Sequence, residues 1–445
     1  MRLTQRITQE TGGLRPPLAK SHMNLRLDHL LDDLRTNGAD ILRAIDTDPL
    51  LVKRQSGALV LANAGGALFT PQQQHQLFAK GIVYLRDPFR LVSLPLVKIY
   101  NLGEKSVSAA DLAGIASEPG NARLHFLQKL DGTLLQRFQH DGRVYFTTRG
   151  MIEGGPCYGS QDEDASARAA NFDFLGTARR LAQAKYPALC EARPEFENVT
   201  LVFEFLHPET RVITNYGERE DLVLLACFDR TDHRYRTFTE VKELASAHAL
   251  VHVDEFAPPG NTIGEQIESL LASIAGTDHE GTVITIEHGH RVVYRVKVKG
   301  PDYLRVLKLV VTCTYDRTVE LIDAHPHWKE WADVEAHLRS LGREQVPEEV
   351  LGFYREHYDV YASYIADCER LRDWACARGA EVRKEAEAEA GIGNDRLLRK
   401  CFAARAVKMP LKPLLFAALN GRLDISAVRQ FARSPAEARD AVTQL

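Results

Sequence analysis

The sequence has few cysteines, no long apolar run and no strong excess of either charge. Its seven cysteines include no C-x-x-C pair, which argues against a zinc ribbon or a disulfide framework and favours a reducing, cytoplasmic location. No apolar run approaches the ~18–20 residues that span a bilayer, and the N-terminal segment contains no apolar signal region. We therefore expect a cytoplasmic protein that does not enter a membrane.

The composition is that of an ordinary globular protein. Hydrophobic residues make up 44% of the 445 positions and charged residues 26%, with a formal net charge of −4. These values exclude collagen-like, low-complexity and largely disordered chains, and the length suggests two or three domains.

Three regions differ in their pattern. Residues 1–22 are polar and contain Gly-Gly and Pro-Pro pairs, so we expect a flexible leader, and either Met1 or Met23 could be the start. Residues 23–325 contain short β-rich runs between turn signals, whereas residues 326–445 follow a helical pattern. We therefore predict an α+β domain of antiparallel sheets with flanking helices, followed by an all-helical C-terminal domain.

Local spacing predicts the individual elements. A helix begins near Leu27 and should end at Asn37-Gly38, and Asp141-Gly142 predicts a tight hairpin. The predicted strands are 58–62, 81–85, 91–94, 126–129, 133–138, 143–147, 201–205, 211–216, 222–228, 281–287 and 291–299. The further predicted helices are 164–186, 237–249, 264–275 and 395–407.

One short string could carry chemistry. Lys129 ends a β-rich run and is followed by Leu130, Asp131 and Gly132. A turn of this kind can present a single amine inside a pocket at the edge of a sheet, although a lysine on a surface hairpin gives the same pattern.

Further charged residues follow in order along the chain. Glu204 lies in a Phe-Glu-Phe string, and Glu280 opens an E-G-x-V string. Lys297 and Lys299 stand at i and i+2 of a predicted strand, which places both ammonium groups on one face. Like charges side by side repel unless an anion lies between them, and a polyphosphate would serve. Each of these residues could instead be an ordinary exposed strand or turn residue.

In this order, K-x-D-G, F-E-F, E-G-x-V and K-x-K resemble the motif set of the covalent nucleotidyltransferases, which include ATP-dependent ligases and mRNA capping enzymes. The strings KIYNLGE (98–104) and FLHPETRVI (205–213) are similar to K-F-F-N-x-x-E and F-x-x-P-x-x-R-I-V of the phage-type RNA ligases that join single-stranded ends. The resemblance covers residues 57–310. It departs at Lys80, Thr133 and Arg149, where the family favours Arg, Ser and Lys.

The resemblance implies an ATP-grasp-like ligase adenylation domain and roles for individual residues. Lys129 would attack the α-phosphorus of ATP and carry a lysyl-AMP, with Lys297 and Lys299 acting on the α-phosphate. Glu280 and Glu204 would bind or orient a divalent metal, Mg²⁺ or Mn²⁺. The residues expected to contact ATP are Lys80, Lys98, Asp131, Gly132, Arg149, Glu204, Lys297 and Lys299.

The implied function is an ATP-dependent RNA ligase that joins RNA 5′-phosphate and 3′-hydroxyl ends. We expect a monomer, and an end-healing kinase or phosphatase is a candidate partner. A DNA nick ligase, a capping-type guanylyltransferase and a nucleotide- or RNA-binding module without catalysis remain as alternatives.

Two other features remain open. His288 with His290, and His325 with His327, have spacings that metal ligands can show, but no carboxylate or cysteine pattern accompanies them. Residues 376–433 hold twelve Lys or Arg against six Asp or Glu. These cations could form ordinary solvated helix faces or a surface that tracks an RNA backbone.

Overall fold

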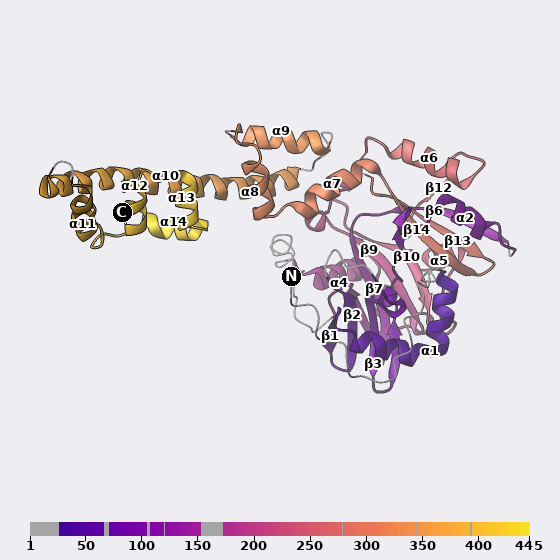
Figure 1. The fold of residues 1–445 in the computed structure, drawn as a ribbon. Coiled ribbons are helices and arrows are strands. Elements are labelled where there is room, and N and C mark those ends of the chain that lie inside the picture. The colour runs from indigo at the N-terminus through magenta and orange to yellow at the C-terminus, as the bar shows by residue number, and fades with distance from the viewer. Residues whose placement is uncertain are drawn as a thin grey trace, which may run out of the picture. The chain divides into compact units, whose positions relative to one another are not determined.

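A computed structural model describes residues 26–65, 71–104, 107–119, 121–152, 172–277, 279–328, 330–342, 346, 348–391 and 394–445. The chain divides into two compact units, Met1–Leu304 and Arg305–Leu445, and each is described by itself (Figure 1). The predicted leader, residues 1–22, lies outside the described residues, and the predicted domain boundary after residue 325 stays a prediction.

The first unit is built on three β-sheets, which confirms the predicted α+β class. Their strand orders are β1-β2-β3-β4, β11-β10-β9-β7-β8 and β12-β6-β13-β14-β5. Neighbouring strands pair antiparallel, apart from β5 and β14, which pair parallel. The strands are β1 (Leu51–Ser56), β2 (Leu59–Ala64), β3 (Lys80–Arg86), β4 (Phe89–Ser93), β5 (Tyr100–Asn101), β6 (Ala122–Lys129), β7 (Thr133–His140), β8 (Arg143–Thr148), β9 (Val199–Leu206), β10 (Asp221–Asp229), β11 (Arg234–Tyr235), β12 (Glu255–Phe256), β13 (Gly281–His288) and β14 (Arg291–Lys299).

Helices cover the sheets of this unit and bury their apolar faces. Leu181 of α4 and Val241 of α5 pack on the sheet that contains β9, while Leu112 of α2 and Ile267 of α6 pack on the sheet that contains β13. The α-helices are α1 (Leu27–Thr47), α2 (Ala109–Ala116), α4 (Phe174–Lys185), α5 (Phe238–Ala247) and α6 (Ile263–Ile274). The 3₁₀ turns are η1 (Gln74–Phe78), η3 (Pro187–Cys190), η4 (Pro194–Phe196) and η5 (Pro208–Thr210).

The K-x-D-G turn links two of the sheets. Strand β6 ends at Lys129 in one five-stranded sheet, and β7 begins at Thr133 in the other. The three residues between them therefore lie where the two sheets meet, and side chains from both sheets can converge there.

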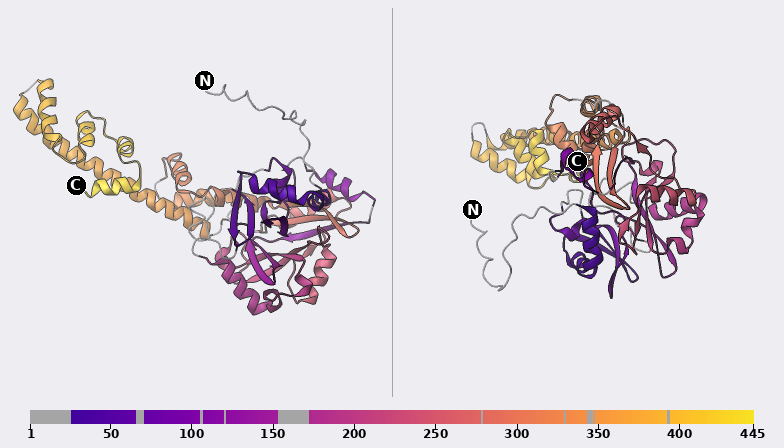
Figure 2. Two further views of the ribbon diagram at one scale, coloured as in Figure 1. Left: turned by 90° about the horizontal axis from the view of Figure 1, so that it is seen from below. Right: turned by 90° about the vertical axis from the view of Figure 1, so that its right-hand side faces the viewer.

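The second unit is helical, as predicted. Helix α10 is its long central element, and α11 to α14 pack along it around a core that includes Leu371, Phe402 and Leu415 (Figures 1 and 2). Helix α7 begins in the first unit and continues into the second. The helices are α7 (Pro301–Thr312), α8 (Tyr315–Asp323), α9 (Trp331–Gly342), α10 (Glu348–Ala390), α11 (Asp395–Ala406), α12 (Lys412–Leu419), α13 (Ile425–Phe431) and α14 (Pro435–Val442).

Two element predictions were wrong, and a third was confirmed in part. The helical geometry does break at Asn37, with φ −116°, but a second helical segment follows within α1 because Leu42 and Ile45 continue the buried stripe. Residues 211–216 do not form a strand, because the backbone N–H groups of Ile213 and Thr214 donate to the side chain of Asp131. The helical pattern begins at Pro301 rather than after residue 325.

Some elements were not predicted, and one was only partly described. Strands β1, β5, β11 and β12 and helix α2 were missed, three of the strands being two residues long. Of the predicted helix 164–186, α4 covers 174–185, and residues 153–171 lie outside the described part. None of the described helices is both long and apolar enough to span a bilayer.

Candidate active site

Strand register brings the predicted site residues together. Gly281 on β13 lies opposite Lys129 on β6 and opposite Lys299 on β14. In the other sheet, Glu204 on β9 lies opposite Leu134, near the start of β7. Because β6 and β7 are joined by three residues, charges from both sheets surround the same turn.

A buried carboxylate bridges two of the lysines. Glu280 is 4% exposed, and its Oε2 lies 2.5 Å from Lys129 Nζ while its Oε1 lies 2.8 Å from Lys299 Nζ. As predicted, Val296 and Val298 point into the core and Lys297 and Lys299 lie on the other face of β14. The Glu280 carboxylate thus lies between the ammonium groups of Lys129 and Lys299, while the anion expected between Lys297 and Lys299 stays a prediction.

Asp131 is held inside the turn by hydrogen bonds. Its Oδ2 accepts from the backbone N–H groups of Ile213 and Thr214, both at 2.9 Å, and its Oδ1 accepts from the hydroxyl of Tyr303 at 2.8 Å. These bonds prevent residues 211–216 from pairing as a strand. They also join the K-x-D-G string to the end of the FLHPETRVI string, so the two motifs form one unit.

Gly132 is required by the close approach of β9. A Cβ at this position would lie 2.5 Å from the carbonyl oxygen of Phe205 and 3.1 Å from Cγ of Glu204. The Gly132 N–H donates to Glu204 Oε1 at 3.0 Å, which fixes that carboxylate beside the turn. Any larger residue would push the turn away from the strand.

A cavity of about 560 Å³ opens over this turn, and most of the predicted site residues line it. Among the described residues, the cations that line it are Lys80, Lys98, Lys129, Arg149 and Lys297, and the acidic side chain is Glu204. Its apolar wall contains Leu96, Val97, Ile99, Leu134, Leu225 and Val283. The structure thus combines a cationic surface suited to a polyphosphate with an apolar surface suited to a flat ring.

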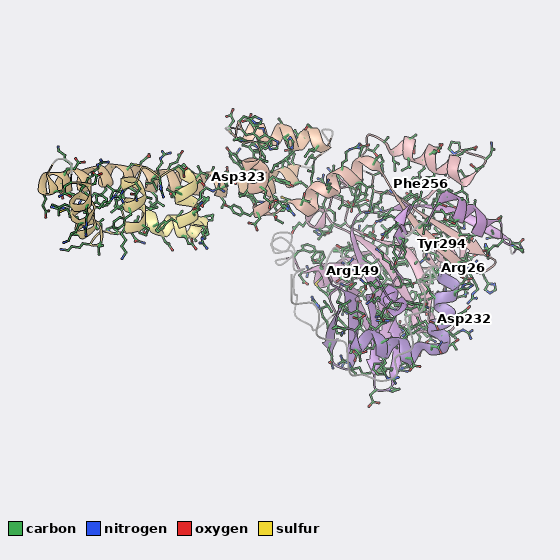
Figure 3. All side chains as sticks on the ribbon, in the orientation of Figure 1. Arg26, Arg149, Asp232, Phe256, Tyr294 and Asp323 are labelled. Atoms are coloured by element: carbon green, nitrogen blue, oxygen red, sulfur yellow. The ribbon has the colours of Figure 1, made fainter. Side chains whose placement is uncertain are left out.

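Not every predicted residue borders the cavity. Gly132 lines it, whereas Asp131, Glu280 and Lys299 lie next to lining residues without lining it themselves. Arg149 follows the C-terminal end of β8 in the first unit (Figure 3).

Crowding of positive charge changes the proton affinity of two lysines. Burial, with Lys129, Lys98 and Lys299 nearby, lowers the pKa of Lys297 to about 7. Burial, with Arg149 and Lys98 nearby, lowers the pKa of Lys80 to about 8. An anionic ligand in the cavity would reverse these effects, so the site favours occupation by negative charge.

The pKa of Glu204 is raised, whereas the pKa values of the two lysines are lowered. Burial raises its pKa to about 7, with Glu280 adding to the rise, while Lys129 and the Gly132 N–H oppose it. The carboxyl group can therefore be protonated or ionised near neutral pH.

A buried network supports the cationic wall. Gln136 donates to the carbonyl oxygen of Gly81 at 2.6 Å and accepts from Ser93, whose hydroxyl also contacts Thr200 at 2.9 Å. A Cβ on Gly81 would lie 3.1 Å from Cα of Arg149. The backbone at Gly81 therefore packs closely against the backbone at Arg149, above the buried network.

Carboxylates near the turn are too few to enclose a metal ion alone. In the part of the chain that the structure describes, no group of three or more His, Cys, Asp or Glu side chains could hold one. The histidine pairs therefore form no such group either, and His288 instead contacts the Ile115 carbonyl oxygen at 3.0 Å. Glu204, which lines the cavity, fits a magnesium ion that is held mainly by water and phosphates, whereas both oxygens of the other predicted ligand, Glu280, are engaged by lysines.

Sequence reasoning missed residues that shape the site from a distance. Tyr303, Tyr216 and Gln136 all bond to motif residues or to their neighbours. Pro301-Asp302 could have indicated a helix start that places Tyr303 four residues after Lys299. Gln136 is a polar residue in a β-rich run and offered no comparable signal.

Comparisons with known proteins identify no family by sequence. No family model matches the chain, and no curated protein matches it. Among solved structures, an archaeal ATP-dependent RNA ligase is 11% identical, with a TM-score of 0.42, 76% of this chain and 82% of that chain covered. A candidate ATP-dependent DNA ligase from Aquifex aeolicus is 14% identical, with a TM-score of 0.36, 77% of this chain and 80% of that chain covered. A Naegleria gruberi RNA ligase variant solved with ATP and Mn is 16% identical, with a TM-score of 0.33, 47% of this chain and 57% of that chain covered.

Proposed function

We propose that the chain is an ATP-dependent RNA ligase that works through a lysyl-AMP. The observation that carries this proposal is the setting of Lys129, whose amine borders a cavity together with four other cations and one carboxylate. Its side chain is 20% exposed, so a substrate in the cavity can reach the amine while bulk water is largely excluded.

The first step is transfer of AMP to the enzyme. The unprotonated Lys129 nitrogen attacks the α-phosphorus, the bond from this phosphorus to the bridging oxygen breaks, and pyrophosphate leaves. Negative charge builds up on the phosphate oxygens during this step. Lys80, Lys98, Arg149 and Lys297 line the same cavity and would stabilise that charge.

Glu280 would act as the base that accepts a proton from Lys129. Its Oε2 lies within hydrogen-bond distance of Lys129 Nζ, so it can accept the proton that the ammonium group must lose. Its second oxygen is held by Lys299, which keeps the carboxylate pointing at the amine. Lys299 would thus act by orienting Glu280 as well as by its charge.

Glu204, which lines the cavity, would hold the divalent metal, with the remaining ligands from water and phosphate. Both oxygens of Glu280 are engaged by Lys129 and Lys299, so Glu280 would act on the nucleophile and not as a metal ligand. When bound, such an ion neutralises part of the triphosphate charge. Asp131 and Gly132 would position the nucleophile, since their contacts hold the turn that carries Lys129.

The RNA specificity rests on the two strings that resemble phage-type RNA ligases. Lys98, from the first string, lines the cavity, and Ile213, from the second, bonds to Asp131. In the later steps, AMP would pass from Lys129 to an RNA 5′-phosphate, and an RNA 3′-hydroxyl would then displace AMP.

A joining assay separates this proposal from its alternatives. We expect the chain, ATP and Mg²⁺ or Mn²⁺ to circularise or join single-stranded RNA with a 5′-phosphate, and a Lys129→Ala variant to do neither. Sealing of nicked DNA in preference to RNA, or protein labelling by GTP instead of ATP, would contradict it. No reaction with either nucleotide would favour a binding module without catalysis.

A further inference from the structure

Helix α11 of the second unit carries three basic side chains on its exposed face. Arg396, Arg399 and Lys400 stand at i, i+3 and i+4, so they lie on one side of the helix. All three are exposed, whereas Cys401 and Phe402 are buried in the core of this unit. The helix thus presents a concentrated positive face to solvent.

These three cations have no counter-ion in the part of the unit that the structure describes, unlike several cations on α10. Within the described residues, none of them makes a hydrogen bond or an ion pair. On α10, by contrast, guanidinium nitrogens of Arg372, Arg378 and Arg383 lie 2.8, 2.5 and 2.8 Å from neighbouring carboxylates. Arg405, at the other end of α11, also reaches a carboxylate at 2.7 Å, that of Glu389. Among the cations without an ion pair in the described part of this unit, these three share one face of a single helix.

Their position on the helix adds to the local positive potential. The N-terminal end of a helix carries a partial positive charge, and α11 begins at Asp395. Like charges at i, i+3 and i+4 repel one another. The sequence of α11 contains one acidic residue, Asp395, against four basic ones. An anion lying on this face would relieve both effects.

We propose that the exposed face of α11 binds the phosphate backbone of an RNA strand. The identity of the strand rests on the proposed ligase function, while the charge argument rests on α11 alone. Guanidinium groups can bind phosphate oxygens through two hydrogen bonds, and such contacts hold a strand without reading its sequence. The second unit would thereby hold RNA at a surface separate from the ATP cavity.

Salt dependence tests this contact directly. The full-length triple variant Arg396→Gln, Arg399→Gln, Lys400→Gln keeps good helix formers, and binding of a labelled single-stranded RNA is measured without ATP. Each lost phosphate contact should reduce the slope of log affinity against log salt by ~0.7. Affinity falls by some factor when salt rises from ~50 to ~200 mM. If two contacts are lost, this factor should be about 7 times smaller than in the wild type.

A matched control removes the same charge elsewhere. The variant Arg372→Gln, Arg378→Gln, Arg383→Gln loses three cations that already have carboxylate partners, and its slope should equal that of the wild type. Equal slopes for the two triple variants would overturn the proposal, as would displacement of the RNA by polyglutamate as effectively as by unlabelled RNA.

Adenylylation distinguishes this proposal from the ligase proposal. Lysyl-AMP formation with labelled ATP should be the same in the α11 variant and the wild type, because Lys129 lies in the other unit. If the wild type forms no lysyl-AMP, the ligase proposal fails while the α11 surface is still judged by its salt slope. A loss of labelling in the α11 variant would contradict a role confined to RNA binding.

Discussion

Lys297 is expected to lower the free energy of unfolding of the first unit. Burial and three neighbouring lysines lower its pKa from 10.5 to about 7. The unfolded chain therefore binds more protons than the folded chain between these two values, and stability rises with pH across this interval. The unfavourable contribution is complete below about pH 7 and fades as the pH rises towards 10.5.

The size of the effect follows from the shift. The fall in pKa from 10.5 in the unfolded chain to about 7 in the folded chain lowers the free energy of unfolding by ~4 kcal/mol at pH 7. At pH 9 the same shift lowers it by ~2 kcal/mol. Because the side chain is only partly buried, solvent screening reduces both values by about half. Replacing Lys297 by Met, which keeps an unbranched side chain but removes the ammonium group, should stabilise the fold by ~2 kcal/mol at pH 7 and ~1 kcal/mol at pH 9.

Thermal unfolding of wild type and Lys297→Met at both pH values measures this effect. We expect the melting temperature to rise by ~3 °C at pH 7 and by about half as much at pH 9. Lys408→Met, at an exposed position of the second unit, is the control and should change little at either pH. A Lys297→Met variant that is less stable than the wild type, or equally stabilised at both pH values, would refute the reasoning. The same variant should lose lysyl-AMP formation, which links the instability to the proposed activity.

Two further changes test the turn. Gly132→Ala should cost about 2–4 kcal/mol, because the new Cβ would lie 2.5 Å from the Phe205 carbonyl oxygen, and should slow adenylylation; denaturant unfolding and labelling with ATP would show both effects. Gly150→Ala, where nothing lies within 4 Å of the added atom, is its control, and similar costs for the two variants would contradict the packing argument. Tyr303→Phe removes one of the three donors to Asp131 and should cost about 1–3 kcal/mol by denaturant unfolding, whereas an unchanged stability would show that this hydrogen bond does not hold the turn.

The strand part of the site could be predicted because alternation along a strand is regular. Val296 and Val298 had to face the core, so Lys297 and Lys299 had to share the opposite face, and the structure confirms this. The Asp141-Gly142 hairpin also follows from local chemistry, since both residues adopt positive φ, at 47° and 70°.

Contacts between distant segments could not be predicted in the same way. The Asp131 carboxylate was expected to contact ATP, but its hydrogen bonds go to Ile213, Thr214 and Tyr303, which lie at least eighty residues away, at |i−j| of 82, 83 and 172. Nothing in the local pattern around 211–216 indicates that these backbone groups bond to a side chain instead of a strand. Contact of Asp131 with ATP stays a prediction.

Helix ends depend on the same balance between local and tertiary effects. Asn37-Gly38 is a typical stop signal, and the helical geometry breaks at Asn37, yet a second helical segment follows because it buries Leu42 and Ile45. By contrast, α10 ends at Ala390, and Gly391 follows it at a φ of +76°, a conformation that favours glycine.

Peptide mapping after reaction with ATP tests the central claim most directly. The full-length protein is incubated with α-labelled ATP and Mg²⁺ or Mn²⁺, digested, and analysed by mass spectrometry for an acid-labile adenylate. We predict a single modified position, Lys129, and no labelled protein from Lys129→Ala. Adenylate found on another lysine, or label retained by Lys129→Ala, would contradict the account.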